Sequence, residues 1–108
     1  MTMDFSTWSG VSGDVVNHEV NMGGTTLMRM LTCLGLPREE DGQVELDEFH
    51  AKVRAAIDGW GPENPGYPDA AHRDAYGKDG NYYLYWLGEL DSMCVSGRHT
   101  GDKFVTWF

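Results

Sequence analysis

A run of apolar residues at helical spacing, closed by a glycine, constrains the fold of this chain more than any other feature. The run consists of Leu27, Met30, Leu31 and Leu34. Residues three or four positions apart lie on one face of a helix, so the spacing predicts an amphipathic helix. Gly35 ends it, because glycine readily adopts the left-handed closing conformation, and Pro37 prevents its continuation. Asn21 is the expected cap at its start, since its side chain accepts hydrogen bonds from unpaired helix N–H groups.

Two further segments show the same spacing. One runs from Asp47 to Gly59 and the other from Asn81 to Gly97. Their apolar stripes are Phe49, Val53, Ala56 and Ile57 in the first, and Tyr83, Leu87, Leu90 and Cys94 in the second. Gly88, within the second helix, costs about 1 kcal/mol relative to alanine. We therefore expect another part of the chain to approach its backbone closely.

Three segments have the character of β-strands. Residues 3–8 and 103–108 are rich in aromatic and β-branched side chains, and residues 14–20 alternate along the chain. In this alternation the residues on one face are Val16, His18 and Val20.

The resulting order β-β-α-α-α-β predicts an α+β fold. We expect a small antiparallel or mixed sheet of two or three strands packed with three helices. A chain of 108 residues suffices for one core, so residues 1–108 are expected to form a single domain. Within it, residues 1–13 are expected to form a loose edge strand.

Two connections are distinctive. Residues 37–45 are interpreted as an acidic loop around an Asp41-Gly42 turn. Residues 60–80 contain three prolines and several aromatic side chains, without an apolar stripe. A loop of this length is unusual in so small a domain, which indicates either a functional or a mobile segment.

The charge is strongly negative. The chain carries 17 acidic residues against 8 Lys and Arg, a net charge of −9. Direct nucleic-acid binding is therefore not expected, because its affinity depends on basic side chains that neutralise phosphates. A basic protein surface is a compatible partner, since complementary fields guide the encounter, although acidity also serves solubility alone.

The two cysteines, Cys33 and Cys94, fall in the predicted helices and are expected to be buried thiols. The first ten residues lack the basic and apolar regions of a secretory signal, and no run has the roughly eighteen apolar residues of a membrane span. We therefore expect a cytoplasmic protein in a reducing compartment.

The segment VNHEVNMGGTT, residues 16–26, holds the most suggestive polar side chains. His18 and Glu19 are adjacent, so on a strand they point to opposite faces and are poorly placed to share a metal. A phosphate-binding loop would need a lysine, and none precedes Lys52. We interpret the segment as a structural corner between strand and helix and expect no metal or cofactor. Its corner residues are His18, Asn21, Gly23 and Gly24.

No pattern of catalytic residues is recognisable, so we predict no enzymatic activity. Aromatic side chains in loops and near chain ends are typical of binding surfaces. The interaction candidates are Trp60, Tyr67, Tyr76, Trp107 and Phe108, together with the acidic residues Glu39, Glu40 and Asp41. The final strand is apolar on both faces, and at a sheet edge it would offer a route to a homodimer.

The chain also resembles a group of short proteins of unknown function from phages of actinobacteria and from their hosts. The resemblance covers roughly residues 14–108. It rests on the segments VNHEVN, LMRMLTCLGL, LDEFHAKVRAAI, GWGPENPGY, LYWLGELDSMC and KFVTWF. The chain departs from the family pattern in that Trp60-Gly61 precedes Asn64-Pro65, and in its Trp-Phe finish. The resemblance implies a phage origin, for which the compartment would be the host cytoplasm, and it carries no catalytic residues.

We therefore expect a small acidic accessory protein that binds a host protein through the loop aromatics or the acidic segment 39–48. One alternative is an acidic mimic of nucleic acid that blocks a DNA-binding protein, which requires a continuous acidic face. Another is a ligand-binding or enzymatic domain at the corner, residues 17–26, which requires His18 and Asn21 to converge on a pocket.

Overall fold

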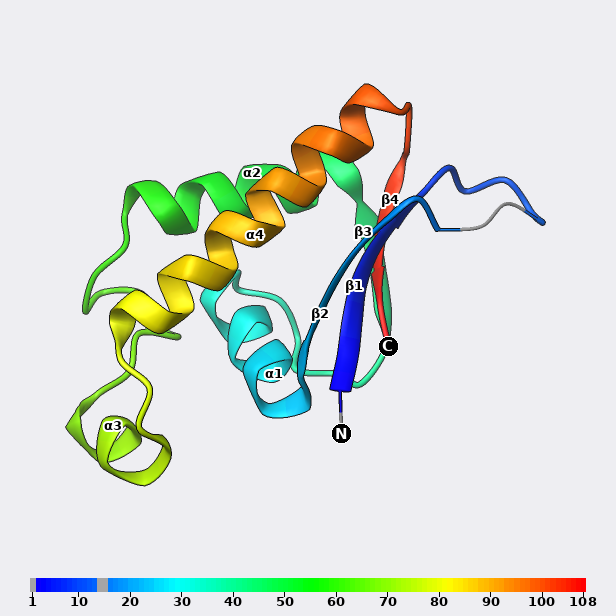
Figure 1. The fold of residues 1–108 in the computed structure, drawn as a ribbon. Coiled ribbons are helices and arrows are strands. Elements are labelled where there is room, and N and C mark those ends of the chain that lie inside the picture. The colour runs from blue at the N-terminus through cyan, green and yellow to red at the C-terminus, as the bar shows by residue number, and fades with distance from the viewer. Residues whose placement is uncertain (1, 14–15) are drawn as a thin grey trace.

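The chain folds into two layers, a β-sheet and a set of helices that cover one of its faces (Figure 1). A computed structural model describes residues 2–13 and 16–108, and the described residues form four strands and four helices. In chain order these are β1 (Thr2–Trp8), β2 (His18–Gly23), α1 (Gly24–Cys33), β3 (Gly42–Glu45), α2 (Leu46–Asp58), α3 (Ala70–Tyr76), α4 (Gly80–His99) and β4 (Phe104–Trp107). The predicted α+β class is confirmed.

The strand order in the sheet is β2-β1-β4-β3, and every neighbouring pair is antiparallel. The strands nearest the two ends of the chain therefore lie side by side in the middle, with Phe5 opposite Trp107. The prediction that residues 1–13 form an edge strand is wrong, because β1 pairs on both sides. The final strand is not at an edge either, so it has no free side for pairing with a second copy.

The core lies between the sheet and the helices. Alternate residues of β1 face the helices, and the Phe5 ring packs against Phe49 and Trp107 at centroid distances of 5.4 and 6.0 Å. The three predicted helical stripes supply most of the remaining core. Its fully buried members include Leu27, Met30, Leu31, Phe49, Val53, Leu87 and Leu90.

Two elements were not predicted. Gly42–Glu45 forms β3 where we expected an acidic loop, and Ala70–Tyr76 forms α3 within the expected loop 60–80. The sheet therefore has four strands instead of two or three, and the order is β-β-α-β-α-α-α-β. The apolar pattern missed α3 because this helix has no buried residue. Its Asp69 cap, which accepts a hydrogen bond from His72 N at 2.8 Å, and its left-handed Gly77 end were the remaining signals.

The corner between β2 and α1 differs from its prediction in detail. The strand begins at His18, four residues later than expected, and residues 14 and 15 lie outside the described part of the chain. Asn21 does not cap α1, because it lies within β2 and donates to Asp4 Oδ1 at 2.6 Å. The helix begins directly after Gly23, with no side-chain cap.

A buried carboxylate joins the end of α4 to the centre of the sheet. Asp102 is 6% exposed, and its oxygens accept hydrogen bonds from Thr7 Oγ1 at 2.7 Å and Asn17 Nδ2 at 2.5 Å. Thr100 Oγ1 lies 3.2 Å from the same carboxylate. A buried charge is tolerated only when donors surround it, so these contacts fix the turn between α4 and β4.

The neighbouring side chains of Ser6 and Thr7 are both fully buried but differ in their partners. Thr7 donates to Asp102, whereas Ser6 Oγ has no hydrogen-bond partner among the described residues. Thr7→Val should lower the free energy of unfolding by about 1.5–3 kcal/mol, because the carboxylate loses a donor. Ser6→Ala should leave it within about 1 kcal/mol or raise it, since no bond is lost. Urea unfolding of both variants measures the difference, and equal losses would contradict this account.

Two of the glycines in α4, Gly88 and Gly97, also differ in their surroundings. A Cβ at Gly88 would meet no atom within 4 Å, so the expected close approach is not found there. A Cβ at Gly97 would lie 2.8 Å from Leu46 Cδ1 and 3.0 Å from Thr7 Cγ2. The close contact between helix and sheet is therefore at Gly97.

Gly88→Ala should raise the free energy of unfolding by up to about 1 kcal/mol, through the better helix propensity of alanine. Gly97→Ala should lower it by about 1–3 kcal/mol, because the added methyl overpacks the interface with β1 and α2. Thermal or urea unfolding of the two variants tests this prediction, and a destabilised Gly88→Ala variant would contradict the open space around Gly88.

Candidate interaction surface

The acidic segment of the sequence lies along an outer edge of the sheet. Within the described residues β3 pairs with β4 alone. Leu46 N donates to Lys103 O at 2.8 Å, so Leu46 and Lys103 are a hydrogen-bonded pair of the antiparallel ladder. Because bonded and unbonded pairs alternate, Gly42 and Val44 bond to β4, while the N–H and C=O groups of Gln43 and the N–H of Glu45 point away from it. The C=O of Glu45 belongs to α2, because Glu45 is the N-cap of that helix.

Two tryptophans hold this edge in place. Trp107 packs so closely against Gly42 that a Cβ there would overlap its indole ring, and its Nε1 donates to Glu39 O at 3.1 Å. Trp8 Nε1 donates to Gln43 Oε1 at 3.1 Å. Trp107 is only 4% exposed, so its prediction as a contact residue is wrong. It positions the acidic segment instead.

The carboxylates at this edge are exposed. They are Glu39, Glu40 and Asp41 before the strand, Glu45 at its end, and Asp47 and Glu48 in the first turn of α2. Asp47 pairs with Arg98 at 2.9 Å, and the other five make no ion pair with any described residue. The edge therefore combines unpaired backbone groups with uncompensated negative charge.

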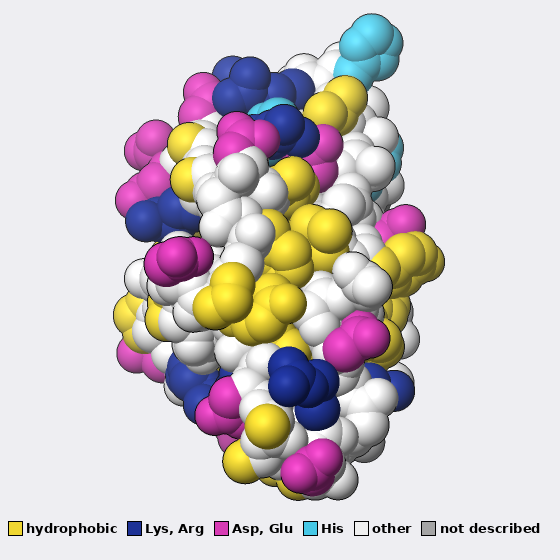
Figure 2. Space-filling model, turned by 90° about the vertical axis from the view of Figure 1, so that its left-hand side faces the viewer, with side chains coloured by type: hydrophobic (Ala, Val, Ile, Leu, Met, Phe, Trp, Pro, Cys, Tyr) yellow, Lys and Arg dark blue, Asp and Glu magenta, His cyan; other side chains and the backbone are white. Residues whose placement is uncertain are grey.

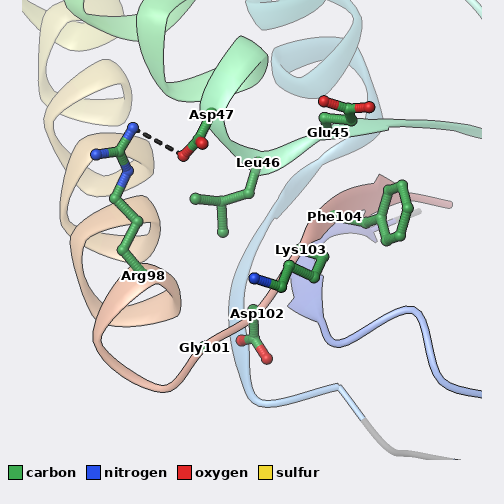
Figure 3. A pocket seen from close by; sticks show the side chains of 8 residues that line it. All are labelled: Glu45, Leu46, Asp47, Arg98, Gly101, Asp102, Lys103 and Phe104. Carbon is green, nitrogen blue, oxygen red and sulfur yellow. Dashed lines mark ion pairs between the residues drawn. The ribbon is translucent and has the colours of Figure 1, made fainter.

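A cavity of about 490 Å³ opens at the end of β3. It is lined by Glu45, Leu46, Asp47, Arg98, Gly101, Asp102, Lys103 and Phe104. Figure 3 shows the Arg98–Asp47 ion pair on one side of it, with Glu45 and Phe104 on the other. Its charged groups have both signs, and Asp102 is already engaged by its donors. The cavity thus extends the edge without forming a catalytic arrangement of its own.

The loop aromatics do not form one surface. Trp60 and Tyr67 are half-buried against each other, with ring centroids 5.3 Å apart, and Trp60 Nε1 donates to Gly80 O at 3.1 Å. They hold the loop that leads to α3. Tyr76 and Phe108 are 58% and 60% exposed, but Tyr76 is the last residue of α3 and Phe108 follows β4.

The residues of the predicted corner, His18, Asn21, Gly23 and Gly24, also do not form one surface. His18 faces the helices, where its Nε2 lies 3.3 Å from Thr100 Oγ1, whereas Asn21 is on the opposite face beside Asp4. They do not converge on one pocket. Gly23 and Gly24 form the junction at which β2 becomes α1. The described residues contain no group of three or more His, Cys, Asp or Glu side chains arranged to hold a metal ion.

Trp8 was missed as a member of this surface, and Gln43 and Glu45 were included only as part of the segment 39–48, without being expected to form a strand. Gln43-Val44-Glu45 alternates between polar and apolar residues, but three residues are too short a signal for a strand. The position of Trp8 beside Gln43 depends on β4 lying between their two strands. Neither relation is visible in local sequence.

Both cysteines are free and buried, as predicted. Burial raises the pKa of each thiol from its ordinary value of 9.0 to about 12.

Since the thiolate is the reactive form, both cysteines should react with a disulfide reagent at pH 8 far more slowly in the native protein than in urea. The stability conferred by the protonated thiols is present below pH 9 and is lost as the pH rises toward 12. Rapid labelling of either native thiol would contradict this burial.

None of the described helices has the length and apolar character of a membrane-spanning helix. Comparison with known proteins finds no matching family model, no matching curated protein and no matching solved structure. The function is therefore inferred from the chemistry of the surface itself.

Proposed function

We propose that this protein binds a partner protein by adding a basic, extended segment of that partner to the outer edge of β3. The observation that carries the proposal is the set of outward backbone groups at Gln43 and Glu45, placed among unpaired carboxylates. Strand addition takes its affinity from main-chain hydrogen bonds and its selectivity from neighbouring side chains. Here the neighbouring side chains are acidic, so they favour Lys and Arg.

The same carboxylates explain why the edge would select a partner of opposite charge. A second copy of this chain aligned at β3 would bring like charges together, which opposes self-association at an exposed edge. A basic segment would instead be attracted to these carboxylates. Following the resemblance to phage proteins, the partner would be a host protein.

The two alternatives receive less support. A nucleic-acid mimic needs a continuous acidic face, but the helix-bearing side in Figure 2 intersperses Lys and Arg with Asp and Glu around a hydrophobic patch. A ligand-binding corner needs His18 and Asn21 to converge, and they lie on opposite faces of the sheet.

Removing charge from the edge should weaken binding of a peptide that alternates Lys with Thr or Val. The test variant is Glu40→Gln, Asp41→Asn and Glu45→Gln. The control variant removes three exposed charges elsewhere, through Asp58→Asn, Glu63→Gln and Asp74→Asn. At about 0.5 kcal/mol for each charge, the test variant should bind roughly tenfold more weakly, and the control should bind nearly as the parent does.

A variant that removes a backbone N–H of β3 distinguishes strand addition from simple charge attraction. Gln43→Pro removes an N–H that points away from β4, so it should abolish the peptide-induced amide shifts of β3 in NMR spectra. Gln43→Ala keeps that N–H and controls for loss of the contact with Trp8. Equal binding by the proline and alanine variants would exclude strand addition, and equal binding by both charge variants would exclude the acidic edge.

A further inference from the structure

The segment that carries α3, residues 68–79, is fixed at both of its ends. Before it, the Arg29 guanidinium donates to Tyr67 O at 3.2 Å. After it, Gly80 packs against the same tyrosine, because a Cβ at Gly80 would lie only 2.8 Å from the Tyr67 ring. Trp60 Nε1 also donates to Gly80 O at 3.1 Å. The two ends therefore meet at Tyr67, and residues 68–79, here named the α3 flap, extend from this fixed base.

The helix in the middle of the α3 flap is joined to the rest of the molecule by one histidine. α3 has no buried residue, and Figure 1 shows it apart from the sheet, beyond the start of α4. His72 Nε2 lies 2.6 Å from the hydroxyl oxygen of Tyr83 in α4, and the two rings meet edge to face. Among the described residues, no other side chain of α3 forms a hydrogen bond or ion pair outside the flap. Lys78, which lies over the Tyr82 ring at 4.4 Å, holds only the end of the flap.

The hydrogen bond between these two side chains requires a neutral imidazole. Tyr83 is 2% exposed, and its hydroxyl has no other partner among the described residues, so it donates to His72 Nε2. The titratable groups that face His72 are Arg29 from α1, Tyr83 from α4, and Asp69 and Tyr76 from the flap. Burial, and then the Arg29 guanidinium, lower the pKa of His72, whereas Asp69 acts in the opposite direction. A proton on Nε2 would turn the acceptor into a donor and add a second positive charge near Arg29.

We propose that the α3 flap is a pH-sensitive device that is closed while His72 is neutral and opens when His72 takes up a proton. In the open state the imidazolium is hydrated, so the open state binds the proton more tightly and acid favours it. The contribution of His72 to closure is complete above pH 6.5, its ordinary pKa, and is lost as the pH falls through the lowered pKa of the closed state. Opening exposes the Tyr83 hydroxyl and unwinds α3, because seven residues are too few for a stable isolated helix.

Amide hydrogen exchange, corrected for the intrinsic rate at each pH, tests this device between about pH 7.5 and about pH 5. The reporters are the amides of Arg73 and Gly77, which donate to carbonyls within the flap. Their protection should fall severalfold, and by at most about tenfold for each pH unit, because opening takes up one proton. The amides of Leu87 and Leu90, in the middle of α4, should keep their protection. An equal loss there would overturn the proposal, since the pH would then act on the whole domain.

Three variants assign the effect to the contact between His72 and Tyr83. His72→Gln keeps an oxygen acceptor but cannot gain a proton, so the protection of the flap should no longer depend on pH in this range. His99→Gln is the matched control, because His99 is exposed at the end of α4, and it should retain the pH dependence of the parent. Tyr83→Phe keeps the histidine and removes its donor. It should lower the protection at neutral pH and leave a smaller pH dependence, which serves as the test if the glutamine variant does not close.

The ring signals of His72 in NMR spectra of the parent give a second readout. Their titration midpoint should lie below 6.5, since the closed state disfavours the proton. A midpoint at or above 6.5, or an unchanged pH dependence in the His72→Gln variant, would overturn the proposal. The inference does not depend on strand addition at β3, because no partner takes part in these measurements.

Discussion

The pairing of β1 with β4 is the interaction on which the rest of the structure depends. These strands come from the two ends of the described chain and form the middle of the sheet. Phe5 and Trp107 lie opposite each other and supply the surface against which Phe49 packs. Because both central places are taken, β2 and β3 occupy the edges, and their outward groups remain free for other contacts.

The polar network around Asp102 explains how these ends are held together. A carboxylate with so little exposure would oppose folding if it lacked donors. Thr7 and Asn17 reach it from β1 and from the connection to β2, and the carboxylate sits where α4 turns into β4. The network therefore specifies the register between distant segments, while the apolar contacts supply most of the stabilising energy.

Negative charge at both sheet edges connects the fold with the proposed activity. Glu45 at one edge and Glu19 at the other oppose pairing with further copies of the same acidic chain. The same charges attract basic groups. Under the proposed function, the same side chains would protect an exposed edge and recognise a basic partner.

The sequence by itself determined the three long helices, the closing glycines of the first two, Gly35 and Gly59, and the acidity of the segment before α2. Each follows from local patterns that repeat over several turns, and short-range geometry dictates those patterns. The third closing glycine was wrong, because α4 continues past Gly97 to His99. The sequence did not reveal β3 or α3, because four residues carry little periodicity and α3 buries no side chain. Only the tertiary structure decided the strand order, the burial of Trp107 and the placement of acids at free edges. These depend on contacts between residues nearly a chain length apart, for which local sequence has no signal.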